Sequence, residues 1–200
     1  LGCGGTIARM VEVGKDVYYA AFSSCPKTLP VDADQTTLIK ELLAANDVLG
    51  LPKNNRFVFD FDVRHFPKQR QEILDAMIKL QQQLQPHLVF MPCSNDLHQD
   101  HQVIYAEGLR AFKSCSTLGY ELPWNNLVFQ SNYFVRLNTQ HIEKKMAALL
   151  EYKSQLKRNY LNKDFIYGLA TTRGVQAGTA YAEAFEVLKF ISSYENCYVA

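Results

Sequence analysis

Residues 87–101 read HLVFMPCSNDLHQDH, and this stretch decides the fold. Its first five residues, 87–91, form the compact apolar run that is typical of a buried strand. The polar loop 92–99 follows, and the pattern from 100 to 113 predicts a helix that begins near Asp100. A strand, a loop and a helix in this order form half of a βαβ unit, so we expect the loop at the carboxyl end of a strand.

The rest of the chain repeats this alternation in both directions. Strands are predicted at residues 17–22, 56–63 and 133–137, and helices at 6–13, 35–48, 69–85, 139–157 and 160–170. Residues 181–190 fit a strand or a helix by pattern, and we interpret their core as a strand. The alternation predicts an α/β fold with a mostly parallel sheet flanked by helices.

Composition favours a single globular domain over residues 1–200. Of the 200 residues, 48% are hydrophobic and 20% are charged, which suits one domain with its own core. The 21 Lys and Arg nearly balance the 20 Asp and Glu, so no excess charge favours nucleic acid or an anionic membrane as a partner. No apolar run approaches the roughly 20 residues of a membrane span. We therefore expect a small-molecule partner and leave the oligomeric state open, a homo-oligomer included.

The five cysteines are odd in number and widely spread, and they form no CxxC pair. This pattern argues against a disulfide framework and against a structural zinc ribbon. We interpret them as buried, reduced thiols of a cytoplasmic protein: Cys3, Cys25, Cys93, Cys115 and Cys197.

Residues 1–6, LGCGGT, have the pattern of a glycine-rich turn that leads into a helix. Such a turn normally follows a strand, so we expect residues upstream of Leu1. As the phosphate loop of a dinucleotide-binding fold, the turn lacks a third glycine at the usual spacing. A nicotinamide oxidoreductase would also need an acidic residue about 20 positions further on, where Phe22, Ser23 and Ser24 stand instead.

Two of the chain's five histidines lie with two aspartates within residues 96–101, directly after the predicted strand 87–91. Ligands of parallel α/β sheets bind at this end of the strands. Imidazole is the usual metal ligand and also a proton carrier near neutral pH. Spacing alone suggests that His98 and His101 both bind a metal, although a catalytic zinc site needs about three protein ligands and the others are not evident. The structural alternative is that Asp96 caps the helix and the histidines bind nothing.

Three segments together resemble the PIG-L/LmbE-like deacetylases. Residues 1–8, LGCGGTIA, resemble the segment that follows that family's His-Pro-Asp-Asp-Glu motif, and residues 97–101, LHQDH, resemble its second motif, His-x-Asp-His. Near the end, residues 173–178, RGVQAG, and 181–186, YAEAFE, resemble the family's closing segment. The matches occur in the expected order and cover nearly the whole chain.

The resemblance implies a Rossmann-like fold and a metal-dependent hydrolase that removes an acetyl group from an N-acetylated amino sugar, such as N-acetylglucosamine, or from a sugar conjugate. It implies that His101 is a metal ligand and that zinc, or another divalent ion, is the metal. His98 matches the histidine that polarises the tetrahedral intermediate and helps to protonate the leaving amine. Asp100 then lies where a carboxylate can orient the imidazole of His98. The family thus separates the two histidines that spacing alone would treat alike.

The sequence departs from the family at its beginning. No His-Pro-Asp-Asp precedes Leu1, and in the family that motif supplies two further metal ligands and the general base. We therefore expect a further segment on the order of 15 residues, one strand and its motif loop, upstream of Leu1.

Two arginines are weaker candidates for binding the substrate. Arg64 follows a predicted strand, where it could meet a sugar hydroxyl or phosphate, or else form a surface ion pair with Asp62 or Glu72. Arg173 precedes Gly174, and a glycine lets a backbone approach a ligand closely.

A different class of function also fits the sequence. A non-catalytic sugar- or nucleotide-binding domain of the same fold would need none of the missing ligands. Trp124, beside Pro123 in a loop, could line a pocket in either case, although core or subunit contacts suit the aromatic residues around it better.

Overall fold

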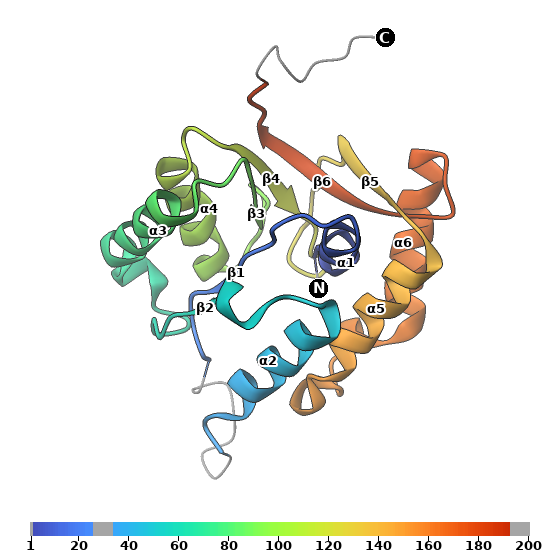
Figure 1. Cartoon of the computed structure of the whole chain (residues 1–200), viewed down its shortest axis with the longest axis horizontal. Coiled ribbons are helices and arrows are strands. Elements are labelled where there is room, and N and C mark those ends of the chain that lie inside the picture. The colour runs from blue at the N-terminus through green and yellow to red at the C-terminus, as the bar shows by residue number, and fades with distance from the viewer. Residues whose placement is uncertain (1, 26–33, 193–200) are drawn as a thin grey trace. The chain divides into compact units, whose positions relative to one another are not determined.

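A computed structural model describes residues 2–25 and 34–192 of the chain (Figure 1). The chain divides into two compact units, which we describe one at a time. The first unit consists of Leu1–His65 and Phe134–Ala184, and the second consists of Phe66–Tyr133 and Phe185–Ala200. None of the described helices is both long and apolar enough to cross a bilayer.

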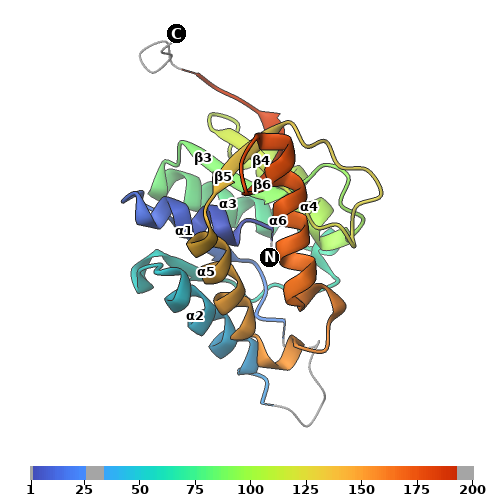
Figure 2. The same cartoon turned by 90° about the vertical axis from the view of Figure 1, so that its right-hand side faces the viewer.

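The first unit pairs two short parallel strands and packs its helices on one another. Strand β1 (Tyr19–Ala21) runs parallel to β2 (Arg56–Val58), with Tyr19 opposite Arg56. Helices α1 (Gly4–Glu12) and α2 (Thr37–Leu49) both pack against α5 (Thr139–Leu150), and α6 (Lys163–Ala177) packs against α5 as well (Figure 2). Short 3-10 turns complete the unit: η2 (Lys53–Asn55), η4 (Lys153–Gln155) and η5 (Asn159–Leu161).

The second unit is built around strand β3 (Leu88–Pro92) and helix α4 (Gln99–Ala111). Strand β4 (Ser116–Tyr120) is parallel to β3, and the last part of β6 (Tyr181–Lys189) is antiparallel to β4, with Gly119 opposite Glu186. The hydrogen-bonded strand order is β3-β4-β6-β5; nearly all of β5 (Tyr133–Leu137) and the start of β6 belong to the first unit. The 3-10 turn η3 (Phe66–Lys68) leads to α3 (Arg70–Leu84), which packs on α4.

A glycine in β4 allows the segment that follows β3 to pack closely against β4. A Cβ atom placed on Gly119 would lie 2.7 Å from Cα of Cys93, a distance at which two carbon atoms overlap. Only glycine therefore lets the first residue after β3 pass this close to β4. The loop that carries His98 and His101 begins at this contact.

The structure confirms the predicted α/β fold. The strands form two sheets, in which β1–β2 and β3–β4 are parallel as expected and β4–β6 is antiparallel. The predicted strand 56–63 is a strand only over Arg56–Val58. The structure also confirms strand 133–137 and makes residues 181–189 a strand. Strand β4 is not predicted from the sequence, because four of its five residues are buried and they show no alternating pattern. Two helices differ from their predicted bounds, because α5 ends at Leu150 rather than at 157 and α6 continues to Ala177 rather than ending at 170.

The start of α1 is held by a buried carboxylate from β6. Glu183 accepts hydrogen bonds from the backbone N–H groups of Gly5, at 3.0 Å, and Thr6, at 2.7 Å. The Nζ atom of Lys145 lies 2.7 Å from the same carboxylate, and both side chains are almost fully buried. Burial alone would raise the pKa of Glu183, but the charge of Lys145 and hydrogen bonds from Lys145 and Thr6 lower that pKa below its usual value. An ionised Glu183 thus satisfies unpaired N–H groups at the positive end of the α1 dipole.

Replacing Glu183 by glutamine keeps the side-chain volume but removes the charge that Lys145 faces. We expect Glu183→Gln to lower the free energy of unfolding by about 3–5 kcal/mol, as when one partner of a buried ion pair is lost. Denaturant titration at neutral pH measures this loss. The control Glu143→Gln removes an exposed carboxylate from α5 and should change stability by no more than about 0.5 kcal/mol. Equal effects of the two substitutions would contradict the structural role of Glu183.

The same pair predicts a dependence on pH. A carboxyl group with a lowered folded-state pKa contributes its full stability above its ordinary pKa, which is 4.5 here, and loses it as the pH falls through the lower value. The stability difference between the unmodified protein and Glu183→Gln should therefore be constant near neutral pH and shrink on acidification below 4.5. A difference that grows on acidification would show that Glu183 is protonated in the folded protein.

Candidate active site

The loop between β3 and α4 is fixed at its start by a second glutamate of β6. The buried Glu186 accepts a hydrogen bond from the backbone N–H of Ser94, at 2.8 Å, and another from the Ser94 hydroxyl, at 2.6 Å. Two bonds from one carboxylate to one residue set both the position and the direction of the chain there. The start of the loop is therefore held in a fixed position.

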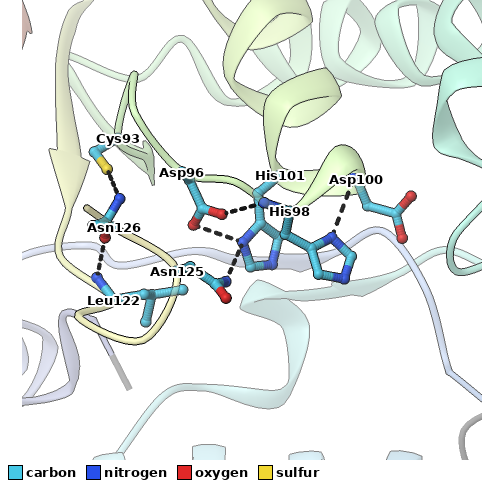
Figure 3. A network of polar contacts seen from close by, with 8 residues as sticks. All are labelled: Cys93, Asp96, His98, Asp100, His101, Leu122, Asn125 and Asn126. Atoms are coloured by element: carbon cyan, nitrogen blue, oxygen red, sulfur yellow. Dashed lines mark hydrogen bonds and ion pairs between the residues drawn. The ribbon is translucent and has the colours of Figure 1, made fainter. Parts of the chain in front are cut away.

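Asp96 is the central side chain of the loop (Figure 3). Its side chain is only 1% exposed, and Oδ1 accepts the backbone N–H of His98 at 2.9 Å. Its Oδ2 lies 2.8 Å from Nδ1 of His101, so one buried carboxylate holds both histidines. The structural alternative, in which Asp96 caps α4, is therefore wrong. The N-cap of α4 is His98, whose Nδ1 accepts the backbone N–H of Asp100 at 3.1 Å.

In the neutral form of each ring, these contacts favour a different tautomer for each histidine. Nδ1 of His101 faces a carboxylate acceptor and carries the proton, so the Nε2 lone pair of His101 is left for a ligand. Nδ1 of His98 accepts from an N–H donor, so the proton of His98 lies on Nε2. The rings are stacked, with centroids 4.6 Å apart. Two adjacent imidazoles thus offer opposite chemistry, an electron pair on His101 and an N–H donor on His98.

A second loop, residues 122–126, packs against the first and stabilises it. Asn126 donates to Sγ of Cys93 at 2.8 Å and accepts the backbone N–H of Leu122 at 3.0 Å, and it forms a backbone bridge with Asp96. The side-chain amide of Asn125 lies 3.4 Å from Nδ1 of His101 (Figure 3). The position of His101 therefore depends on both loops.

Asp100 contributes to the site through its backbone as well as its side chain. Its N–H holds the ring of His98, while Oδ1 of the buried carboxylate accepts the backbone N–H of Phe66 at 3.3 Å. The carboxylate thereby ties the first turn of α4 to the segment before α3. Whether this carboxylate also orients His98 stays a prediction.

Cys93, a described cysteine beside this site, does not act as a nucleophile at neutral pH. Burial raises the pKa of the Cys93 thiol, so it is protonated at neutral pH. Burial, with the charge of Glu183, raises the pKa of Cys3 to about 11. The four described cysteines form no disulfide; Cys93 and Cys115 are buried, Cys3 and Cys25 are half-buried, and Cys197 lies outside the described residues.

The remaining predicted site residues lie in the first unit, whereas both histidines lie in the second. Arg64 is exposed and adopts a left-handed backbone conformation, with φ of 68°. Arg173 lies inside α6, and its Nη1 donates to Gln176 at 2.8 Å. Their contact with a substrate stays a prediction. Among residues 2–25 and 34–192, no group of three His, Cys, Asp or Glu side chains is arranged to hold a metal.

Comparison with known families decides the relationship. The model of the PIG-L family, described as GlcNAc-PI de-N-acetylase, matches residues 1–112, more than half of the 200-residue chain. The chain belongs to the PIG-L family. The sequence-based prediction of a sugar N-deacetylase is thus confirmed at the level of the family. A search of the curated proteins found no match.

Solved structures of three other proteins share the fold of this PIG-L family member. The N,N'-diacetylchitobiose deacetylase from Pyrococcus horikoshii has a TM-score of 0.78 and 20% identity, over 94% of this chain and 78% of its own. A zinc-inhibited form of teicoplanin deacetylase has a TM-score of 0.71 and 16% identity, over 92% and 91%. The 4-carboxy-2-hydroxymuconate hydratase from Pseudomonas putida KT2440 has a TM-score of 0.74 and 18% identity, over 96% and 92%.

The sequence analysis missed the side chains that hold the two histidines in place. They are Asp96, Asn125, Asn126 and Glu186. A sequence signal existed only for Asp96, which lies five residues before His101 in a loop that must turn back on itself. The other three come from segments whose approach depends on the fold.

The tautomers can be tested directly. We expect long-range ¹H–¹⁵N NMR spectra above neutral pH to show the proton of His101 on Nδ1 and that of His98 on Nε2, because their partners are a carboxylate and an N–H group. The exposed His87 provides the reference spectrum of an imidazole in water. Observation of the proton on Nε2 of His101 would contradict the assignment of its free lone pair.

Proposed function

We propose that the protein is a metal-dependent hydrolase that removes the acetyl group from an N-acetylated amino sugar or sugar conjugate. Membership of the PIG-L family supports the reaction class. The observation that carries the proposal to this chain is the 2.8 Å contact of Asp96 with Nδ1 of His101. A carboxylate behind a histidine is the usual arrangement around a metal-ligating imidazole, since it fixes the tautomer and strengthens the other nitrogen as a ligand.

The chemistry divides naturally between the two imidazoles. His101 would hold the metal through Nε2, and a bound divalent ion lowers the pKa of its water toward about 7 and polarises the amide carbonyl. His98 presents N–H at Nε2, which can donate a hydrogen bond to the oxygen that gains negative charge when water adds to the carbonyl. As the C–N bond breaks, the amine nitrogen must gain a proton. We propose that this is the proton that the general base takes from the attacking water, because a neutral His98 that gave up the proton of Nε2 would be left as an imidazolate. The products are acetate and the free amino sugar.

The backbone N–H of Asp100 bears on this role. Because it donates to Nδ1 of His98, it keeps the proton of the neutral ring on Nε2, where the ring can donate a hydrogen bond to the developing oxyanion. The donor therefore has one orientation before the substrate arrives, which avoids the cost of reorganising it during the reaction. We retain Asp100 as a positioning residue of His98 on this ground.

A complete site requires more ligands than His101. By family resemblance we propose that two further ligands and the general base belong to a His-Pro-Asp-Asp motif, which residues 1–200 do not contain. Zinc is the metal that we propose, and iron or another divalent ion suits the same donors. Because a related deacetylase has been solved in a zinc-inhibited form, assays should use one equivalent of metal and no excess. We also retain Arg64 and Arg173 as proposed contacts of the sugar.

The fold alone does not select deacetylation, because a hydratase shares it. Both reactions begin with the addition of water to a polarised carbon. Release of acetate from an N-acetylated sugar distinguishes them, since a hydratase forms one product and releases none. Sugar binding without turnover would instead favour the non-catalytic alternative.

Alanine variants separate the roles of the two histidines. We expect His101→Ala to lose both metal and activity, and His98→Ala to keep the metal but lose about 10²- to 10³-fold in turnover, the usual cost of removing one donor to a developing oxyanion. The measurements are metal content and acetate release from N-acetylglucosamine derivatives, with any residues encoded upstream of Leu1 included. The exposed His87→Ala is the control. Loss of metal in His98→Ala with retention in His101→Ala would reverse the assignment.

Asp96→Asn tests the support of the ligand without removing the ligand. We expect metal affinity to fall by about 10- to 100-fold, the usual cost of losing the partner of a ligating histidine. The control is Asp75→Asn on α3, where the carboxylate is exposed and accepts a side-chain amide bond from Gln71 at 2.8 Å. Titration with one competing chelator measures both. Equal metal affinity in the two variants would show that Asp96 has no part in metal binding.

A further inference from the structure

Two consecutive asparagines lie on the second loop, and their side chains are used differently. The amide of Asn126 is satisfied at both ends, since Nδ2 donates to Sγ of Cys93 at 2.8 Å and Oδ1 accepts the N–H of Leu122 at 3.0 Å. In the described part of the chain, the side chain of Asn125 has a single polar contact, which is with His101. Asn125 is half-buried, so part of its amide is open to a ligand.

The backbone of Asn125 is held on both sides, which fixes where its side chain points. Its N–H donates to the oxygen of Leu122 at 2.8 Å, and its own oxygen accepts the N–H of Leu97 at 3.0 Å. Figure 3 shows the amide directed at the ring of His101, with the ring of His98 on the other side. The amide of Asn125 therefore has one defined place, beside the proposed metal ligand.

The contact between Asn125 and His101 determines which end of the amide faces the ring. Nδ2 of Asn125 lies 3.4 Å from Nδ1 of His101. Nδ1 donates its proton to Asp96, at 2.8 Å, whether or not Nε2 also carries one, so it has no lone pair for a second N–H. The nitrogen and oxygen of an amide have nearly the same shape, and a half-turn about the Cβ–Cγ bond exchanges them. The oxygen can then accept from Nδ1–H, and the NH₂ group lies away from Nδ1.

An NH₂ group in this position is a donor without a protein partner, next to the reacting group of a bound sugar. The carbonyl oxygen of the acetamide is the acceptor for Nε2 of His98, on the other side of the His101 ring. In a sugar whose acetamide is on C2, the neighbouring oxygens are on C1, which carries the conjugate, and on C3, which is a free hydroxyl. Residues 122–135 contain no charged side chain, so this loop suits a neutral hydroxyl.

We propose that Asn125 determines specificity by donating a hydrogen bond from its NH₂ group to the C3 hydroxyl of the bound sugar, while its oxygen faces Nδ1–H of His101. This inference rests on the proposed function and adds a residue that selects among N-acetylated sugars. A sugar without the C3 hydroxyl leaves the NH₂ group unpaired. One neutral hydrogen bond of this kind changes kcat/KM by about 3- to 10-fold.

The first measurement compares two substrates in the acetate-release assay. We expect kcat/KM to be about 3- to 10-fold higher for methyl N-acetylglucosaminide than for its 3-deoxy counterpart. In Asn125→Ala this ratio should fall to about one, because alanine has no donor. The control Asn54→Ala removes an exposed amide from the first unit and should leave the ratio unchanged. If Asn125 only supported the loop, Asn125→Ala would lower kcat/KM for both sugars alike, and the unchanged ratio would overturn the proposal.

A second variant tests the orientation of the amide without turnover. Asn125→Asp keeps an oxygen toward Nδ1–H of His101 and removes the NH₂ group. We expect its zinc affinity to equal or exceed that of the unmodified protein, although its ratio between the two sugars falls as in Asn125→Ala. If Nδ2 instead donated to a lone pair on Nδ1, the new carboxylate would repel that lone pair. Zinc affinity would then fall by about tenfold or more, and the assigned orientation would be wrong.

The third measurement reports binding alone, in the slow variant His98→Ala. The side-chain NH₂ signal of Asn125 in ¹⁵N-labelled protein is identified by its loss when Asn125→Asp is added. We expect methyl N-acetylglucosaminide to shift this signal and the 3-deoxy sugar to leave it in place, because only the first sugar offers the acceptor. An unmoved signal at sugar concentrations that saturate the shifts of other residues would overturn the proposal.

These measurements separate failure of this inference from failure of the proposed function. A shifted Asn125 signal, without acetate release from either sugar by the unmodified protein, keeps Asn125 as a sugar-binding residue and rejects the deacetylase. Acetate release with equal kcat/KM for the two sugars, or with a ratio that Asn125→Ala does not change, keeps the deacetylase and overturns the inference.

Discussion

The buried carboxylate of Asp96 is the interaction on which the candidate site depends. It binds the backbone of His98 with one oxygen and the ring of His101 with the other. A carboxylate that is 1% exposed is costly to bury unless its oxygens are satisfied, so these bonds are needed for stability as well as for chemistry. The same bonds leave the Nε2 lone pair of His101 free and start α4 at His98. The same hydrogen bonds therefore determine both the local fold and the tautomer of His101.

The sequence predicted the fold more fully than it predicted the site. Runs with a clear period were read correctly, as with strand 133–137 and the helix that became α3. Strand β4 was not predicted, because both of its faces are buried and it therefore lacks the polar alternation of a strand at a surface. The end of α6 was placed too early, since its small and polar residues up to Gly178 form a weak helical pattern that packing completes.

The site divides in the same way. His98, Asp100 and His101 share one segment, so a motif could suggest them. Asn126 and Glu186 reach the loop from segments about 30 and 90 residues away, as their separations from Cys93 and Ser94 of 33 and 92 residues show. Such partners follow from strand order and loop packing, which no local pattern contains. Family resemblance separated the roles of the two histidines, and the contacts of Nδ1 in each ring now supply a physical reason for the separation.

Strand β6 contributes Glu183 to the start of α1 and Glu186 to the start of the β3–α4 loop. Successive side chains of a strand alternate between its faces, so the three-residue spacing sends the two carboxylates to opposite sides. Substitution of a residue between them leaves this alternation unchanged. Insertion or deletion of a single residue there reverses one carboxylate and disconnects either the helix or the loop. Length variation among related chains should therefore avoid residues 183–186 and collect in the turns on either side, where no carboxylate depends on the count.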